Sequence, residues 1–169
     1  MTHIYSFAPL TTPSAEILIL GTMPGEVSLA KSEYYAHPRN AFWPIMGHIG
    51  GFDPALPYAE RVEKLLVQRI AVWDVLQGCV RPGSLDADIE RETAVPNDFA
   101  SFWVAHPHLR RVCFNGATAE QLFRKQVWGM LPDTAVGVDY VRLPSTSPAN
   151  ARLSFAQKLA VWQAALSLA

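Results

Sequence analysis

The sequence predicts an α/β fold, a three-layer αβα sandwich with a central, mainly parallel sheet of about four strands. Two observations lead to this prediction. Short β-rich runs alternate with segments of helical periodicity, and each run ends in a loop rich in glycine, proline or polar residues. The runs are residues 16–21, 70–75, 109–115 and 139–143. Alternating strands and helices imply right-handed crossovers, with helices on both faces of the sheet.

Three segments have the i, i+3, i+4 spacing of apolar residues that is typical of a helix packed on one face. They are residues 58–69, 117–127 and 155–168. A further helix is expected to begin at residues 41–43. Because the carboxyl ends of parallel strands meet at one edge, we expect the loops after the four strands to form a single cleft.

Length and composition indicate one globular domain over residues 1–169, with 50% hydrophobic and 17% charged residues. A net charge of −1 argues against a protein that coats nucleic acid, although it allows an enzyme with a small DNA footprint. We find no signal peptide and no apolar run of about 18 residues, so we expect a soluble, cytoplasmic protein. Cys79 and Cys113 are expected to be reduced core residues.

The histidines do not predict a metal site. His37 and His48 have no Asp, Glu or Cys partner at a ligand-type spacing. His106 and His108 flank a proline and are expected at the surface. His37 is expected either to hold its loop by hydrogen bonding or to contact a substrate.

The most informative segment follows the first strand, where the turn Gly21-Thr22-Met23-Pro24-Gly25 leads into residues 34–43. The turn lacks the spacing of a dinucleotide-binding or phosphate-binding loop. Residues 34–43 then present two tyrosines, an imidazole, a guanidinium and an amide, groups that suit a flat heterocycle. Asn40 is open to two interpretations: it caps the helix that follows, or it binds a water or a substrate carbonyl.

A second candidate segment is Ser145-Thr146-Ser147, which lies between Pro144 and Pro148. The prolines stiffen the loop, and its hydroxyls and amides are good phosphate contacts. The alternative is that it only leads the chain into the last helix.

Five blocks of the sequence, in order, resemble the uracil–DNA glycosylase superfamily over nearly the whole chain. The hypoxanthine–DNA (DNA-deoxyinosine) glycosylase branch is the most similar, followed by the mismatch-specific uracil/thymine glycosylases. The blocks are residues 21–25, 34–43, 82–86 (Pro-Gly-Ser-Leu-Asp), 114–116 (Phe-Asn-Gly) and 143–150 (Leu-Pro-Ser-Thr-Ser-Pro-Ala-Asn).

The resemblance implies a catalytic role for Asn40, and His37 is a second catalytic candidate because its imidazole can donate to the departing base. Related families usually have Asn or Asp at the position of Met23, where it positions the attacking water, and a thioether cannot do this. The deoxyinosine branch is similar in this respect and uses the amide at Asn40. Leu143 stands where sister families often have a histidine that stabilises the leaving base.

The resemblance also implies a set of base-binding residues. Tyr35 is expected to stack on a flipped base, and backbone amides of the first turn are expected to face the leaving group. Asp74 and Asn115, at strand ends, lie where sister families contact the base. The full base-binding set is Gly21, Met23, Pro24, Gly25, Tyr35, Asp74 and Asn115.

The loop after the last strand resembles the motif that pinches the DNA backbone and fills the vacated stack. The DNA-binding set implied is Ser145, Thr146, Ser147, Asn150 and Arg152, with Arg152 at the start of the last helix.

The resemblance implies a monofunctional DNA glycosylase that hydrolyses the N-glycosidic bond of hypoxanthine or uracil in DNA. The expected partner is DNA containing a deaminated base, flipped out of the stack. We expect a monomer, with no metal and no cofactor. No lysine stands in a catalytic block, which argues against a lyase step, with Lys31 as the remaining candidate. The alternatives are a catalytically weak lesion binder of the same fold and a hydrolase of free nucleosides.

Overall fold

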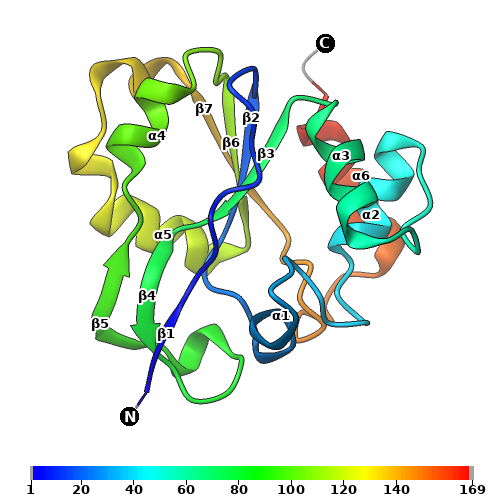
Figure 1. Cartoon of the computed structure of the whole chain (residues 1–169), viewed down its shortest axis with the longest axis horizontal. Helices are drawn as coiled ribbons and strands as arrows, with labels where there is room; N and C mark the ends of the chain where they lie inside the picture. The colour runs from blue at the N-terminus through cyan, green and yellow to red at the C-terminus, as the bar shows by residue number, and fades with distance from the viewer. Residues whose placement is uncertain (1, 168–169) are drawn as a thin grey trace.

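The computed structural model describes residues 2–167. Over these residues the chain forms six α-helices and a four-stranded parallel sheet of strand order β3-β2-β6-β7 (Figure 1). The strands are β2 (Ile17–Gly21), β3 (Ile70–Asp74), β6 (Arg111–Asn115) and β7 (Asp139–Leu143). The chain moves outward from β2 to β3 and then crosses back to β6. The carboxyl ends of β2 and β6 therefore flank a point where the strand order reverses, which is where α/β folds bind ligands.

Helices cover both faces of this sheet, so the predicted α/β sandwich is confirmed (Figure 1). One face packs against α2 (Phe42–Gly50), α3 (Tyr58–Leu66) and α6 (Phe155–Ala165). The other packs against α4 (Phe99–Ala105) and α5 (Ala117–Gln126). The short α1 (Glu26–Lys31) follows the turn after β2 and lies beyond the end of the sheet (Figure 1).

Strand β2 is the centre of the fold. Its residues alternate between the two cores, with Leu18 and Leu20 on the side of α4 and α5, and Ile17 and Ile19 on the other. Because both faces are covered, all five residues of β2 are buried, which explains the continuous apolar run in the sequence.

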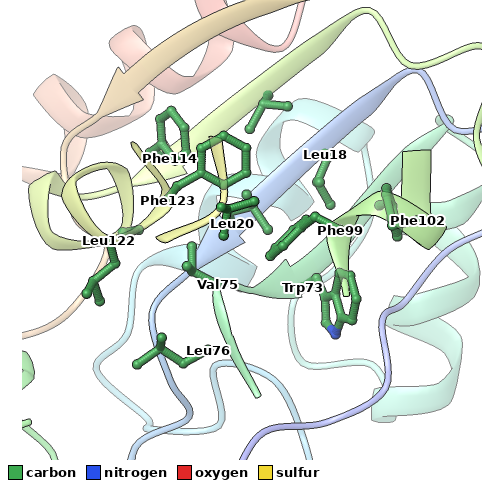
Figure 2. Close-up of a cluster of buried hydrophobic side chains, with 14 of the residues drawn as sticks. Leu18, Leu20, Trp73, Val75, Leu76, Phe99, Phe102, Phe114, Leu122 and Phe123 are labelled. Carbon is green, nitrogen blue, oxygen red and sulfur yellow. The ribbon is translucent and has the colours of Figure 1, made fainter. Parts of the chain in front are cut away.

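Aromatic rings fill much of the core between the sheet and helices α4 and α5 (Figure 2). The Phe123 ring lies 5.2 Å from that of Phe114 on β6 and 5.5 Å from that of Phe99 on α4. This packing holds the ends of β2, β3 and β6 at fixed positions, which is what a binding site at that edge requires.

A second sheet, which the sequence did not predict, lies beside the first. It is antiparallel, with the order β1-β4-β5, and consists of β1 (His3–Tyr5), β4 (Leu76–Val80) and β5 (Glu90–Pro96). The β4–β5 pairing has register shifts, and β5 is charged with no buried residue, so neither strand has regular alternation. The predicted strand 70–75 ends at Asp74, and Val75 leads into β4.

The predicted helices are present, with some different ends. The segment 58–69 is helical only to Leu66, because Arg69 takes a left-handed conformation with φ of 61° and turns the chain into β3. The last helix begins at Phe155 with a Ser154–Gln157 capping box and is helical to Ala165. The predicted end at Leu168 lies outside the described residues.

His106 is buried, so its expected surface position was wrong, whereas His108 is exposed. The Nδ1 of His106 donates to the carbonyl oxygen of Phe102 (2.6 Å), and its Nε2 accepts from the hydroxyl of Thr11 (2.8 Å). Its ring also stacks on that of Phe102, with centroids 3.8 Å apart. These contacts satisfy both ring nitrogens inside the protein.

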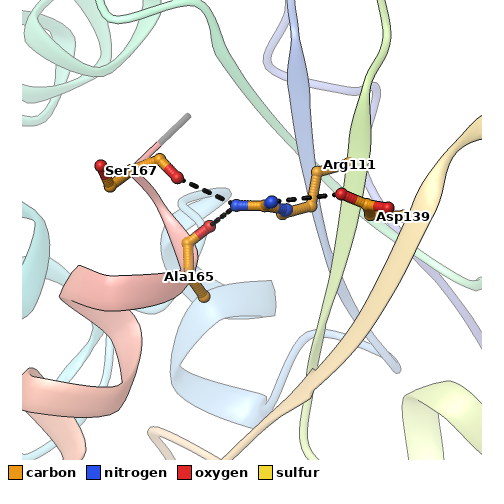
Figure 3. A network of polar contacts seen from close by, with 4 residues as sticks. All are labelled: Arg111, Asp139, Ala165 and Ser167. Atoms are coloured by element: carbon orange, nitrogen blue, oxygen red, sulfur yellow. Dashed lines mark hydrogen bonds and ion pairs between the residues drawn. The ribbon is translucent and has the colours of Figure 1, made fainter. Parts of the chain in front are cut away.

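Arg111 connects the start of β6 to the end of α6 (Figure 3). Its guanidinium donates to the carbonyl oxygens of Ala165 (2.8 Å) and Ser167 (3.0 Å) and to the carboxylate of Asp139 (3.1 Å). A cation at a helix carboxyl end satisfies carbonyls that have no helical partner. This contact fixes α6 at the sheet end opposite to the one described next.

Candidate active site

A cavity of about 690 Å³ lies at the carboxyl end of the parallel sheet. This volume falls within the usual range of ligand pockets. Its walls come from the turn after β2 with the start of α1, the segment 34–40, the ends of β3 and β6, and residues 84–86 and 145–150 of two further loops. Every residue proposed for the site lines this cavity except Arg152: Gly21, Met23, Pro24, Gly25, Tyr35, His37, Asn40, Asp74, Asn115, Ser145, Thr146, Ser147 and Asn150.

The floor of the cavity is formed by Gly21, Thr22, Tyr35 and Asp74, and we call this group the floor. A Cβ atom at Gly21 would lie 2.6 Å from Asp74 Oδ1 and 2.9 Å from the Tyr35 hydroxyl. Only glycine therefore allows the carboxyl and the phenol to approach the end of β2 this closely.

Three polar atoms of the floor have no hydrogen-bond partner among the described residues. They are Thr22 Oγ1, the Tyr35 hydroxyl and Asp74 Oδ2, and all three are enclosed. A buried polar group without a partner costs about 1–3 kcal/mol, so such groups are rare and often have a functional reason. Their convergence in one cavity indicates that a polar ligand completes their hydrogen bonding.

Burial raises the pKa of Asp74 to about 7, and the nearby carboxylate of Asp86 adds to this shift while Arg81 opposes it. Asp74 is only 3% exposed, and it forms no ion pair with any of the described residues. A carboxyl with this pKa can act as a hydrogen-bond donor near neutral pH, which an ordinary aspartate cannot do.

Tyr35 is held rigidly against α2. Its backbone is left-handed, with φ of 55°, and its ring stacks on that of Phe42 with centroids 4.1 Å apart and an interplanar angle of 26°. Burial raises the pKa of its hydroxyl, and Asp74 adds to the shift, so the phenol stays protonated. Because Phe42 covers one face of the ring, a base can stack only on the other face.

Asn40 is partly engaged in local structure. Its side-chain Oδ1 accepts a hydrogen bond from the Phe42 N–H (2.9 Å), while Ala41 occupies the N-cap position of α2. The Asn40 side chain therefore bonds to the first residue of α2, although Asn40 is not itself the N-cap residue. The contact leaves Nδ2 and one lone pair of Oδ1 for other partners, and it fixes the orientation of the amide.

His37 holds its own loop by a hydrogen bond, which is one of the two roles expected for it. Its Nδ1 accepts a hydrogen bond from the Arg39 N–H (3.0 Å). The ring also lines the cavity, so its contact with a substrate stays a prediction.

Asn115 joins the end of β6 to the loop 144–150. Its Nδ2 donates to the Thr146 hydroxyl (2.9 Å), and its Oδ1 accepts from the Thr146 N–H (2.9 Å). The Thr146 carbonyl in turn accepts from the Ala41 N–H (3.0 Å). Asn115 therefore clamps two loops together, and its predicted base contact rests on the one amide hydrogen left over.

The loop 145–150 is bonded within itself and to α6. Ser145 Oγ accepts from the Ser147 N–H (3.1 Å), and Asn150 Nδ2 donates to the Ser145 carbonyl (3.1 Å). The buried Lys158 donates to the Asn150 carbonyl (2.7 Å). Arg152 is exposed and precedes the N-cap Ser154, so it does not begin the helix as expected.

Sequence reasoning did not name Thr22, Ser84, Leu85 or Asp86 as site residues, although all line the cavity. Burial raises the pKa of Asp86. The nearby Thr22 hydroxyl, which lies outside hydrogen-bond geometry, opposes this shift most, followed by Arg81 and Arg91. The signal for these residues was their place inside two blocks of the resemblance, residues 21–25 and 82–86.

Two further findings concern membrane-spanning helices and metal sites among the described residues. The described helices include none that is both long and apolar enough to cross a membrane. Within residues 2–167, His, Cys, Asp and Glu form no group of three that could hold a metal ion.

A parallel α/β sheet with a partly enclosed cavity at its strand-order reversal, lined by both apolar and polar groups, defines an enzyme-type ligand site. The sequence profile of the uracil DNA glycosylase superfamily matches residues 8–166. The chain belongs to this superfamily, and thus to the DNA glycosylases, as the motifs had predicted.

Two curated relatives are each called hypoxanthine DNA glycosylase. The protein from Methanosarcina acetivorans is 38% identical over 149 residues, which cover 88% of this chain and 89% of the relative. The protein from Methanosarcina barkeri is 37% identical over 150 residues, which cover 86% and 87%.

A solution NMR structure from Methanosarcina acetivorans, provisionally described as a uracil DNA glycosylase, superimposes with a TM-score of 0.80. Its sequence is 34% identical, and the match covers 98% of this chain and 97% of that one. The likeness thus extends over nearly the whole chain.

Proposed function

We propose that this DNA glycosylase removes hypoxanthine from DNA by hydrolysing its N-glycosidic bond. The observation that carries the proposal is the floor, where three buried polar atoms converge without partners in one cavity. The names of the two Methanosarcina relatives support the same base. The proposed enzyme works as a cytoplasmic monomer without metal or cofactor, since water is the only co-reactant that this hydrolysis needs.

The floor suits the lactam edge of a deaminated base, where a ring N–H stands beside a carbonyl. A neutral Asp74 carboxyl donates its O–H to the base carbonyl and accepts from the ring N–H, which gives two parallel hydrogen bonds. Tyr35 stacks on the base through the ring face that Phe42 leaves uncovered. Uracil has the same edge and is the second candidate substrate.

The reaction builds positive charge on the sugar and negative charge on the departing base. A neutral Asp74 meets the growing negative charge with an O–H donor rather than with a second anion. Asn40, whose amide is oriented by Phe42, holds the attacking water with Nδ2 and the remaining lone pair of Oδ1. Met23 provides no carboxylate or amide to position the attacking water. In the proposed mechanism, the rate of base release therefore depends mainly on stabilisation of the leaving base.

A single-turnover panel tests this proposal. Oligonucleotides carry hypoxanthine, uracil, xanthine or thymine opposite each normal base, and base release is measured at saturating enzyme. We expect release of hypoxanthine from duplex DNA and none from free deoxyinosine. Tight binding without release would identify a weak lesion binder, and equal hydrolysis of the free nucleoside would identify a nucleoside hydrolase.

A further inference from the structure

We propose that Arg81 is a positioning residue for base release, which holds the Pro24–Gly25 peptide with its N–H directed to the cavity. The inference rests on the proposed function, since it assigns this N–H to the leaving base. Arg81 directly follows β4 and does not line the cavity itself. Its effect on the reaction therefore passes through the turn after β2.

The Arg81 guanidinium is buried and joins two segments of backbone. The residue is 5% exposed. Its Nε donates to the carbonyl oxygen of Gly83 (2.9 Å), and its Nη2 donates to that of Pro24 (2.8 Å). Among the described residues, its enclosed Nη1 has no hydrogen-bond partner, and the guanidinium forms no ion pair. Because a buried charge without an ion pair and an unpaired N–H both disfavour folding, stability alone does not explain this arrangement.

The hydrogen bond to Pro24 fixes the direction of one peptide plane in the cavity wall. The described residues contain no cis peptide bond, so the Pro24 carbonyl and the Gly25 N–H point in opposite directions. With the carbonyl held by Arg81 outside the cavity, the N–H points to the side of the turn that lines the cavity. No group within residues 2–167 accepts from this N–H. It is therefore free to donate to the base, which departs with negative charge.

The Pro24–Gly25 sequence would also allow the opposite orientation of this peptide. Rotating the peptide by about half a turn changes φ of Gly25 from its observed −71° to a positive value, which glycine adopts readily. Proline and glycine at the two central positions suit both of the turn types that differ by this rotation. The flipped peptide would direct a carbonyl oxygen, instead of an N–H, toward the departing anion. Arg81 opposes the flip, because the flipped carbonyl loses its hydrogen bond to a charged donor.

A double-mutant cycle of Arg81→Met and Gly25→Ala tests this role. A Cβ atom at Gly25 would lie 3.6 Å from Ser84 Oγ, which is an ordinary contact. Alanine also disfavours a positive φ, so Gly25→Ala restricts the peptide to its observed orientation without Arg81. Single-turnover release of hypoxanthine is measured at saturating enzyme for both single variants and the double variant, and the melting temperature of each is recorded.

We expect Arg81→Met to lower the rate by about 10- to 100-fold when Gly25 is present. The same substitution should lower the rate by only about threefold when both compared proteins carry Gly25→Ala. Arg110→Met is the control, since it removes an exposed positive charge next to the start of β6, at the opposite end of the sheet. Its rate should equal that of the wild type.

Two results would overturn the inference. One is a rate of Arg81→Met within about twofold of the wild type, and the other is an equal loss with and without Gly25→Ala. The second result would show that Arg81 acts through something other than this peptide. If Arg81→Met does not fold, Arg81→Lys takes its place in the cycle, because it keeps the charge but not the fork that reaches both carbonyl oxygens.

A wild type that releases no base contradicts the proposed function separately. In that event, the NMR resonance of the amide proton of residue 25 decides the role of Arg81. We expect one sharp resonance in the wild type, a broadened or split one in Arg81→Met, and one sharp resonance again when Gly25→Ala is added. A single sharp resonance in Arg81→Met would show that the peptide is fixed without Arg81, and the inference would be wrong.

Discussion

The floor of the cavity and the loop 145–150 differ in how their polar groups are satisfied. The floor keeps Thr22 Oγ1, the Tyr35 hydroxyl and Asp74 Oδ2 without partners, all enclosed. In the loop, hydroxyls, amides and carbonyls bond to one another and to Asn115 and Lys158. The hydrogen bonds of the loop are thus formed within the protein, whereas the three polar atoms of the floor need a ligand as their partner. We therefore propose that the floor recognises the base and that the loop offers a preformed surface for the DNA backbone.

The largest expected effect comes from Asn40, which stands between these two regions. Asn40→Ala should lower the single-turnover rate by about 100- to 1,000-fold, because it removes a fixed polar group at the reacting atoms. Asn40→Asp serves as the companion variant, since its carboxylate still accepts from the Phe42 N–H and keeps the entry to α2. Near wild-type activity of Asn40→Ala with an unchanged melting temperature would contradict the assignment.

Variants of Asp74 test whether the floor recognises the base by hydrogen bonding. Asp74→Ala removes both hydrogen bonds to the lactam edge and should lower the rate by about 10- to 100-fold. Asp74→Asn, which still donates and accepts, should retain much more activity. The exposed Asp133→Asn is the control for loss of a negative charge. If Asp74→Ala and Asp74→Asn lose the same activity, the paired hydrogen bonds are not the cause.

The pH dependence of the rate tests which protonation state of Asp74 is active. Since the pKa of Asp74 is raised to about 7 and the proposed active form is neutral, the wild-type rate should fall as pH rises through about 7. Asp74→Asn should lose this dependence. A wild-type rate that rises over this range would show that the ionised carboxylate is the active form.

The free energy of unfolding should also depend on the protonation of Asp74. Its raised pKa stabilises the folded protein most below about pH 4, and this contribution is lost as pH rises through about 7. Asp74→Asn should therefore melt at a higher temperature than the wild type at pH 8, with the difference shrinking towards pH 4. The expected effect is on the order of a few kcal/mol, since one pKa unit corresponds to about 1.4 kcal/mol.

Tyr35 separates stacking from hydrogen bonding within the floor. Tyr35→Ala removes a stack worth about 1–3 kcal/mol, so it should lower turnover by about 10- to 100-fold. Tyr35→Phe keeps the ring against Phe42 and loses only the hydroxyl, so its loss should be much smaller. If the two variants behave alike, the hydroxyl carries the effect and stacking does not.

The smallest effect is expected in the loop. Replacing Ser145 and Ser147 by alanine should weaken binding of all lesions about equally and leave the saturated rate nearly unchanged. Arg152→Ala should reduce the salt slope of binding by about one unit, as for one phosphate contact. A change in lesion preference would instead place the loop in the base pocket.

The sequence by itself determined the parallel sheet, its covering helices and the set of loops that meet at the cavity. Buried parallel strands need continuous apolar runs, and the turns between elements need glycine and proline, so both leave local patterns. The second sheet left no such pattern, because β4 and β5 pair irregularly and no residue of β5 is buried.

Only the tertiary structure decided which residues at the cavity are free to bind. Asn115 and Asp74 look equivalent in the sequence, as polar residues that end buried strands. In the fold, the amide of Asn115 forms two hydrogen bonds with Thr146. Asp74 instead is enclosed beside Gly21 and Tyr35, and its Oδ2 has no partner among the described residues. Hydrogen bonding and desolvation depend on neighbours brought together from distant parts of the chain, and no local pattern records them.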